Sequence, residues 1–251
     1  MRLSFKPLRR WLATVAAGAL AGPGLAVFAT LPAPAHASIP AHPTWKSSAP
    51  FGTWQNGIFD VYNNEWNTSE AGPQTIWAYS YHHWGVESKQ AATTSVKTYP
   101  SVQKNYNDAK YTSLRSLRSG FTQSMPTAAA YDGEAAYDLW LNNYQIEVMM
   151  WVDNHKQAPA GHIVARVHFY GQKFVLWQSG HDMFSFVLSG VHEKSGTAHL
   201  FSGLRWLVNH GYLSSSVTLT QVDFGWEIAS TGGRPMDFTV TRYWLSTGWR
   251  N

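Results

Sequence analysis

The sequence predicts an all-β domain, either an antiparallel sandwich or a barrel. Short stretches of β-branched and aromatic residues recur along the chain, and Gly, Asn, Pro and Ser separate them. Only one segment has apolar residues at the spacing of a helix. No internal repeat is visible. These three observations favour one domain of many short strands with a single amphipathic helix.

The first 37 residues are predicted to be a secretory signal peptide. Four basic residues and no acid occupy the first ten positions, and an apolar stretch follows. Ala35 and Ala37 then provide an A-x-A arrangement for cleavage after Ala37. A retained membrane anchor is the alternative, since the apolar run approaches spanning length. We expect a secreted protein that has no contact with the membrane once the signal is removed; the pair Arg9-Arg10 leaves Sec and twin-arginine export both open.

The charge of the mature chain argues against a nucleic-acid partner. The whole sequence has 19 Lys+Arg and 15 Asp+Glu, and the four basic residues of the signal account for the difference. The mature part is long enough to bury a core without cross-links. There is no cysteine, so disulfides and zinc sites with cysteine ligands are excluded.

Residues 38–50 are rich in Pro, Ser and Ala and are predicted to form a loose lead before a domain that spans 51–251. The predicted strands, in order, are 57–62, 75–81, 136–141, 145–153, 162–170, 173–178, 183–190, 217–228 and 236–245. A hairpin turn is expected at Gly171-Gln172. The helix is expected at about 197–210, with Ser195 or Thr197 as its cap and Gly211 at its end.

Carboxylates occupy a distinct face of three predicted strands. In 145–153, Ile146, Val148, Met150 and Val152 form an apolar face, and Gln145, Glu147, Met149, Trp151 and Asp153 form the other face. In the same way, Asp138 shares a face with Ala136 and Trp140. Gln221, Asp223, Gly225 and Glu227 share another. Glu147 therefore need not lie in the core, although it lies near the middle of an apolar strand.

Facing carboxylates beside aromatic side chains suggest the cleavage of glycosidic bonds. Sugars present flat C–H faces to Trp, and their hydroxyls bind carboxylates and amides. The chain outside the signal has 12 Trp of the 13 in the sequence. The structural alternative is that these Trp pack the core and that the acids are ordinary solvated side chains.

Five motifs in order together resemble glycoside hydrolase family 12. They are "YNNEWN" (62–67), "KTYPSV" (97–102), "AAYDLWL" (135–141), "IEVMMWVDN" (146–154) and "FGWEIASTGGRPMDFTV" (224–240). The resemblance extends over nearly all of 53–245. It implies a β-jelly-roll sandwich of two antiparallel sheets with a concave substrate cleft.

The resemblance also implies roles for single residues. Glu147 would be the nucleophile and Glu227 the acid/base of a retaining mechanism, and Asp138 would steady the nucleophile. The substrate-binding residues would be Asn64, Trp66, Tyr99, Met149 and Trp151. Three features depart from the family pattern: Lys97-Thr98 before the Tyr-Pro pair, Ala229 after Glu227-Ile228, and the lack of a disulfide.

The expected activity is that of a secreted endo-β-1,4-glucanase that acts on cellulose-like or mixed-linkage β-glucans. Two alternatives stay open: a xyloglucan-specific endoglucanase, and a carbohydrate-binding jelly roll without turnover. Family 11 xylanases share the fold and a Glu pair, but the NNxW and EVMMW motifs favour family 12. We expect a monomer with no cofactor. We also expect no metal site, because the histidines lack HExxH or comparable ligand spacing.

Overall fold

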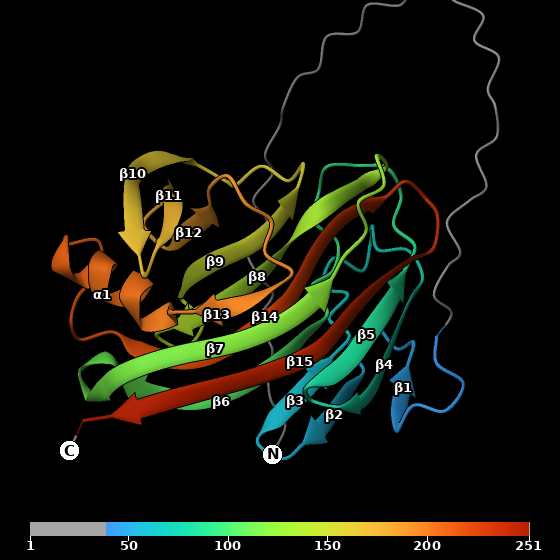
Figure 1. Cartoon of the computed structure of the whole chain (residues 1–251), viewed down its shortest axis with the longest axis horizontal. Helices are drawn as coiled ribbons and strands as arrows, with labels where there is room; N and C mark the ends of the chain where they lie inside the picture. Colours follow the sequence, from blue (N-terminus) through green and yellow to red (C-terminus); the bar gives the residue numbers. More distant parts are fainter. Residues whose placement is uncertain (1–38, 251) are drawn as a thin grey trace, which may run out of the picture. The chain divides into compact units, whose positions relative to one another are not determined.

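The computed structural model describes residues 39–250, so the expected signal peptide of residues 1–37 lies outside the described residues. Within the described residues two β-sheets pack face to face, and a single α-helix lies beside them (Figure 1). Every strand pair in the sheets is antiparallel except β12–β9. The predicted all-β sandwich with one helix is confirmed. No helix within residues 39–250 is long and apolar enough to cross a membrane.

The smaller sheet has six strands. In spatial order they are β1 (Trp45–Ser47), β4 (Gln74–Ser80), β5 (His83–Ser88), β15 (Met236–Trp249), β7 (Leu114–Ser124) and β13 (Ser195–Ala198). The strand β1 pairs with β4 inside the segment that was expected to be a loose lead.

The larger sheet has nine strands and contains all the predicted catalytic residues. In spatial order they are β10 (His162–Phe169), β11 (Gln172–Ser179), β12 (Met183–Leu188), β9 (Ile146–His155), β8 (Tyr131–Leu141), β14 (Thr218–Thr231), β6 (Ser101–Lys110), β3 (Phe59–Tyr62) and β2 (Thr53–Asn56). A 3₁₀ turn, η1 (Tyr111–Ser113), connects β6 to β7.

The core fills the space between the two sheets. In residues 135–141 of β8 and 222–228 of β14 every second side chain is apolar and buried, as the period of a strand requires. Phe224 of β14 lies against Tyr137 of β8 and against Phe121 of the opposite sheet, with ring centroids 4.5 and 5.2 Å apart. Trp84 and Trp226 pair across the sheets in the same way, at 4.9 Å. This packing uses up one face of each central strand and leaves the other face for polar groups.

All nine predicted strands are present, with ends that differ by a few residues. Six further strands were not predicted: β1, β2, β5, β6, β7 and β13. The longest of them, β6 and β7, read "SVQKNYNDAK" and "LRSLRSGFTQS" and are too polar to show a β-branched and aromatic pattern. They are strands because Val102, Leu114, Leu117 and Phe121 reach the shared core.

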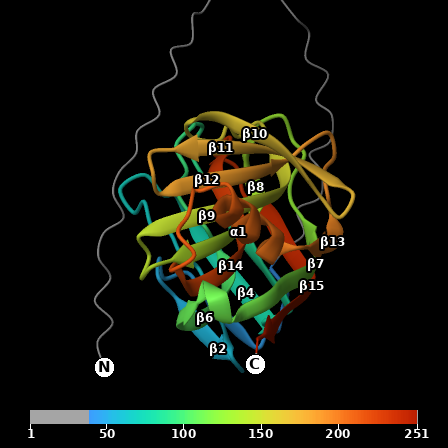
Figure 2. The same ribbon diagram turned by 90° about the vertical axis from the view of Figure 1, so that its left-hand side faces the viewer.

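The helix α1 (Leu200–Asn209) starts later than expected. Residues 195–198, where the cap was expected, form β13, and His199 precedes the helix without a side-chain cap. Gly211, with φ of +77°, follows the end of the helix as predicted. Leu200, Leu204 and Leu207 are buried, and α1 packs against β7 and β9 (Figure 2).

The hairpin of β10 and β11 turns at Tyr170-Gly171, one residue earlier than predicted. Both residues have positive φ, 48° and 87°, which is the geometry of a two-residue turn that matches the twist of the strands.

Candidate active site

The face of the nine-stranded sheet that points away from the core is called the outer face below. On β9, Val148 and Met150 pack into the core, so that Glu147 and Met149 lie on the outer face. The predicted alternation therefore holds for this part of the strand. Glu147 is half-buried and not part of the core.

The prediction for Asp153 is wrong, because a bulge interrupts β9. Ala136 pairs with Trp151 whereas Ala135 pairs with Asp153, so Val152 is an extra residue on β9. Past the bulge the alternation reverses, and Asp153 points between the sheets. There it accepts a hydrogen bond from Gln123 Nε2, at 3.1 Å, and pairs with His192 Nδ1 at 2.7 Å. Asp153 therefore ties β9 to the other sheet.

Three adjacent strands bring five carboxyls to the outer face. β8 lies in the middle, with β9 on one side and β14 on the other. Glu147 lies opposite Trp140 of β8, and Glu227 lies opposite Glu134. Asp138 lies opposite Asp223 and is a diagonal neighbour of Glu147. The predicted trio of Glu147, Glu227 and Asp138 thus occupies one face of neighbouring strands.

Glu134 was not among the site residues predicted from the sequence. It precedes the predicted strand 136–141, whereas β8 begins at Tyr131. Extending the alternation of Asp138 and Ala136 by two residues toward the N-terminus would have placed Glu134 on the same face. Asp223 was predicted on the correct face but without a role.

The five carboxyls fall into two groups by exposure. Glu147 and Glu227 are half-buried, so a ligand can reach them from solvent. Glu134, Asp138 and Asp223 are 0%, 2% and 2% exposed. Two accessible glutamates therefore sit in front of three buried acids.

Burial raises the pKa of every one of these acids. Burial, followed by the charge of Glu227, raises the pKa of Glu147 to about 8. Burial raises the pKa of Asp223 to about 8 and also raises that of Glu227. For Asp138, burial and then the charges of Glu147 and Glu227 raise the pKa well above its usual range. Glu147 and Glu227 are thus close enough for their charges to interact, although β8 lies between their strands.

A neighbouring segment holds Tyr99 beside the acids. The backbone N–H of Ile228 donates to Thr98 O at 3.0 Å, and that of Tyr99 donates to Asn64 O at 2.9 Å. The Tyr99 hydroxyl donates to Ala136 O at 3.1 Å. The charge of Asp138 is the largest of the acid contributions that add to burial in raising the pKa of Tyr99. Asn64 and Tyr99 are therefore joined to each other and to the strand of Glu227.

Gly225 makes this close approach possible. A Cβ at this position would lie 2.0 Å from Pro100 O and 2.9 Å from Ser101 Cα. Only glycine lets the 97–100 segment run this near to β14. Two departures from the family pattern also meet here, since the buried ammonium of Lys97 donates a hydrogen bond to Ala229 O.

The other predicted substrate-binding residues differ in exposure. Trp66 is 39% exposed and can offer its ring to a ligand. Met149 and Trp151 are buried on the outer face with Ala136, and the half-buried Met183 and Val187 pack against them. The Trp151 Nε1–H donates to Met149 Sδ at 3.4 Å. Met149 and Trp151 therefore form a buried apolar layer beside Glu147. They do not offer an exposed surface on which a sugar ring could stack.

Three hydrogen bonds extend the site toward the β8–β9 turn. Trp140 Nε1 donates to Asp223 Oδ2 at 3.2 Å, and Gln221 Nε2 donates to Asp223 Oδ1 at 2.7 Å. The Tyr144 hydroxyl donates a hydrogen bond to Gln221 Oε1 at 2.6 Å. Trp140 was predicted on the face of Asp138 but without a role, and Tyr144 was not among the predicted site residues.

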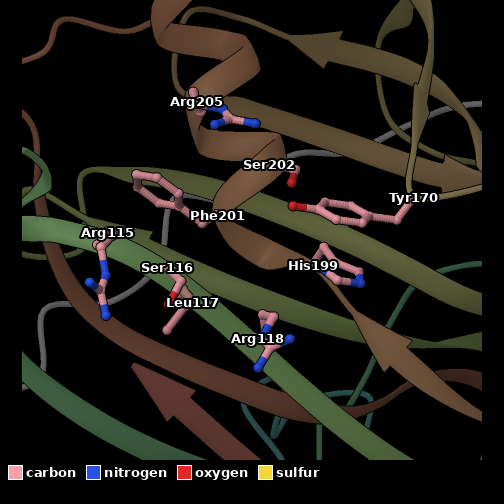
Figure 3. Close-up of a pocket in the computed structure, with 9 residues that line it drawn as sticks. All are labelled: Arg115, Ser116, Leu117, Arg118, Tyr170, His199, Phe201, Ser202 and Arg205. Carbon is pink, nitrogen blue, oxygen red and sulfur yellow. The ribbon is translucent and has the colours of Figure 1, made fainter. Parts of the chain in front are cut away.

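A hollow between β7 and α1 is separate from the carboxyls (Figure 3). Its lining includes Arg115, Arg118 and Arg205 together with Tyr170 and His199, and none of the five acids. Among residues 39–250, no group of three or more His, Asp or Glu is arranged to hold a metal ion.

No protein-family model and no curated protein matches the sequence. Solved structures do match. The xyloglucanase domain of NopAA, a type three effector from Sinorhizobium fredii in complex with cellobiose, has a TM-score of 0.74 at 27% identity, over 82% of this chain and 100% of that one. A family 12 xyloglucanase from Bacillus licheniformis gives 0.70 at 20% identity, over 82% and 100%. An endoglucanase from Rhodothermus marinus gives 0.71 at 19% identity, over 82% and 100%.

The two sheets, the single helix and the carboxyls on the outer face define a jelly-roll sandwich of the glycosidase type. The chain has the fold of glycoside hydrolase family 12, as its motifs predicted.

Proposed function

We propose that this protein is a retaining endo-β-1,4-glucanase that hydrolyses cellulose-like or mixed-linkage β-glucans. The observation that carries the proposal is the pair of half-buried glutamates on one face, Glu147 and Glu227, whose charges interact. The fold is shared with endoglucanases and xyloglucanases, which supports a glycosidase. A retaining mechanism needs carboxyls about 5–5.5 Å apart.

In the first step, a Glu147 carboxylate oxygen attacks the anomeric carbon as the bond from that carbon to the bridging oxygen breaks. Glu227 gives its proton to the departing oxygen, so that the leaving chain ends in a neutral hydroxyl. The product of this step is a glycosyl ester on Glu147, with Glu227 ionised.

In the second step, water attacks the same carbon from the side that the leaving chain vacated. Glu227 takes a proton from this water, and the Glu147 carboxylate departs. The two inversions restore the β configuration, and both glutamates return to their starting protonation.

The crowding of acids supplies the required proton. Because burial raises the pKa values of Glu147 and Glu227, and the charge of Glu227 raises that of Glu147 further, the pair keeps a proton in the neutral range. A coupled pair that holds one proton provides one base and one acid together. Asp138, whose own pKa is raised well above its usual range, stays protonated and can stabilise ionised Glu147 from its diagonal position.

Xyloglucan is the second candidate substrate, because xyloglucanases are among the matched structures. Incubation with carboxymethyl cellulose, mixed-linkage β-glucan and xyloglucan, followed by reducing-end assay and product analysis, distinguishes the candidates. Release of oligosaccharides from an unbranched glucan supports the proposal, and release from xyloglucan alone replaces it with the second candidate. Binding to these polymers without any release would show a non-catalytic jelly roll.

The glutamates are tested by Glu147→Gln and Glu227→Gln. Each should lower the rate on the preferred glucan by about 10³-fold, since each removes a group that forms or breaks a bond. Glu87→Gln, on β5 of the other sheet, is the matched control and should keep full activity. Normal turnover by either site variant would refute the assignment.

We also propose that the protein is secreted as a monomer that starts at Ser38. N-terminal sequencing of the exported protein should find Ser38 first, and its mass in solution should be that of one chain. An intact Met1 in a membrane fraction would support the retained anchor.

A further inference from the structure

The buried acid Glu134 has no role in the reaction described above, yet it lies directly opposite Glu227. The register of β8 and β14 pairs the two residues, so their side chains project side by side from the outer face. Glu134 is wholly buried, whereas Glu227 reaches solvent. An acid this deep inside a protein costs free energy unless it has a partner.

The partner of Glu134 is the carboxyl of Glu227. No N–H or hydroxyl group of residues 39–250 reaches either oxygen of Glu134. The strand register places the Glu227 carboxyl beside that of Glu134, and two carboxyls can hydrogen bond only when one of them carries a proton. The contact therefore exists only while the pair holds at least one proton.

We infer that Glu134 is a positioning residue for Glu227, forming with it a carboxyl pair that retains one proton for transfer to the leaving oxygen. The inference rests on the proposed function. Glu134 touches neither the substrate nor the scissile bond and acts through Glu227. After Glu227 gives this proton to the leaving oxygen, both carboxyls are ionised, which favours the return of a proton from the attacking water to Glu227 in the second step.

The surroundings of the pair favour retention of the proton. The ionisable groups around it are Asp132 and Asp138 of β8, Glu147 of β9, Asp223 of β14, and the phenols of Tyr99 and Tyr131. The charges that act on Glu134 itself are all negative, and the nearby cations Lys97, His155 and Lys156 act on Asp132. After burial, the charge of Glu227 is the largest cause that raises the pKa of Glu134.

The test is the pH profile of kcat/KM for wild type, Glu134→Gln and Glu134→Asp. With Gln at 134 the pair is gone, and Glu227 titrates alone. The alkaline limb on a natural glucan should then move about one pH unit or more to lower pH. Glu134→Asp keeps a carboxyl, so the pH of its alkaline limb should stay close to that of wild type. Asp132→Asn is the matched control: this acid of the same strand lies opposite Ser230 and not Glu227, so its loss should move the limb far less.

A second readout separates positioning from general damage. A cellobioside with a dinitrophenolate leaving group needs no proton from Glu227. Its kcat/KM should change by less than about threefold in Glu134→Gln, while that of the glucan at pH 8 falls by about tenfold. Equal losses on both substrates, or an unmoved limb, would overturn the inference.

If Glu134→Gln does not fold, ¹³C NMR titration of wild-type protein labelled at glutamate carboxyls gives the answer. Glu134 and Glu227 should titrate together in two separated steps, and independent titration would overturn the pair. This measurement needs no turnover. Coupled titration of Glu134 and Glu227 in a protein without glucanase activity would therefore contradict the proposed function alone. Independent titration in an active enzyme would contradict the carboxyl pair alone.

Discussion

The acids of the candidate active site are of two kinds: some are accessible to solvent, and the others are buried beneath these. Glu147 and Glu227 are accessible, whereas Asp138 and Asp223 are buried behind them. A replacement at an accessible position should act on the chemistry, and one at a buried position should act on the protonation of its neighbours.

Tyr99→Phe tests whether the buried Tyr99 hydroxyl contributes to activity. The change removes the hydrogen bond from the Tyr99 hydroxyl to Ala136 O and keeps the ring. We expect kcat to fall severalfold, with a loss of about 1 kcal/mol in the free energy of unfolding, since one buried hydrogen bond is lost. Steady-state kinetics and urea unfolding measure the two effects. Unchanged kcat would show that Tyr99 serves the fold alone.

Trp66→Ala tests whether the exposed ring binds substrate. The ring is 39% exposed, so its loss should cost little stability. If it stacks on a sugar, KM for a glucan should rise by about tenfold or more, as the loss of an aromatic contact implies. Phe at this position should restore most of the affinity. An unchanged KM would remove Trp66 from the substrate-binding residues.

At the scale of elements, close contact between β14 and the 97–100 segment positions Tyr99. Gly225→Ala would place a methyl group 2.0 Å from Pro100 O, so the segment or the strand must move. We expect the free energy of unfolding to fall by about 2 kcal/mol. Activity should fall as well, because Glu227 lies two residues away. Thermal unfolding with parallel assays checks this, and Gly171→Ala, at a turn with open space around it, shows the cost of a strained backbone alone.

Strand periodicity explains which elements the sequence could predict. β8, β9 and β14 alternate clearly, and so their carboxyls can be assigned to a face from the sequence alone. The bulge at Val152 could not be predicted, because residues 148–152 are all apolar and an extra residue among them leaves no mark in the alternation. β6 and β7 were not predicted because most of their residues are polar, so the few apolar residues that reach the core form no recognisable strand pattern.

The order of the strands in the sheet determines which distant residues become neighbours, and the sequence alone does not show this order. Glu134 and Glu227 are distant in the chain, and only the pairing of β8 with β14 places them opposite each other. The motifs located Glu147, Glu227 and Asp138 because each lies inside a recognisable stretch. Trp140 lies near the end of β8 and Tyr144 in the turn that follows, and the local sequence does not show that they contact Asp223 and Gln221.

At the scale of the whole molecule, five buried or half-buried acids make stability depend on pH. The pKa of Glu147 is raised from 4.5, and that of Asp223 from 3.8, to about 8. Between pH 4 and pH 8 the folded protein therefore binds more protons than the unfolded chain, so stability falls as pH rises through this range. We expect Tm to be higher at pH 5 than at pH 8.

The same argument gives the effect of removing one acid. Asp223→Asn takes away a group that must otherwise stay protonated or carry a buried charge, so its Tm should fall less between pH 5 and pH 8 than that of wild type. Calorimetry at several pH values measures this difference. A wild-type Tm that rises from pH 5 to pH 8 would contradict the assigned direction of the pKa shifts.

The central claim is that Glu147 and Glu227 act on the same glycosidic bond. The most direct test is mass spectrometry of the protein after reaction with a 2-deoxy-2-fluoro cellobioside that carries a good leaving group. The fluorine slows breakdown of the glycosyl ester, so the intermediate accumulates. We predict a single label on the peptide that contains Glu147. A label on Asp138, Asp223 or any other residue, or turnover of an unmodified glucan to the α-anomer without labelling, would contradict the account.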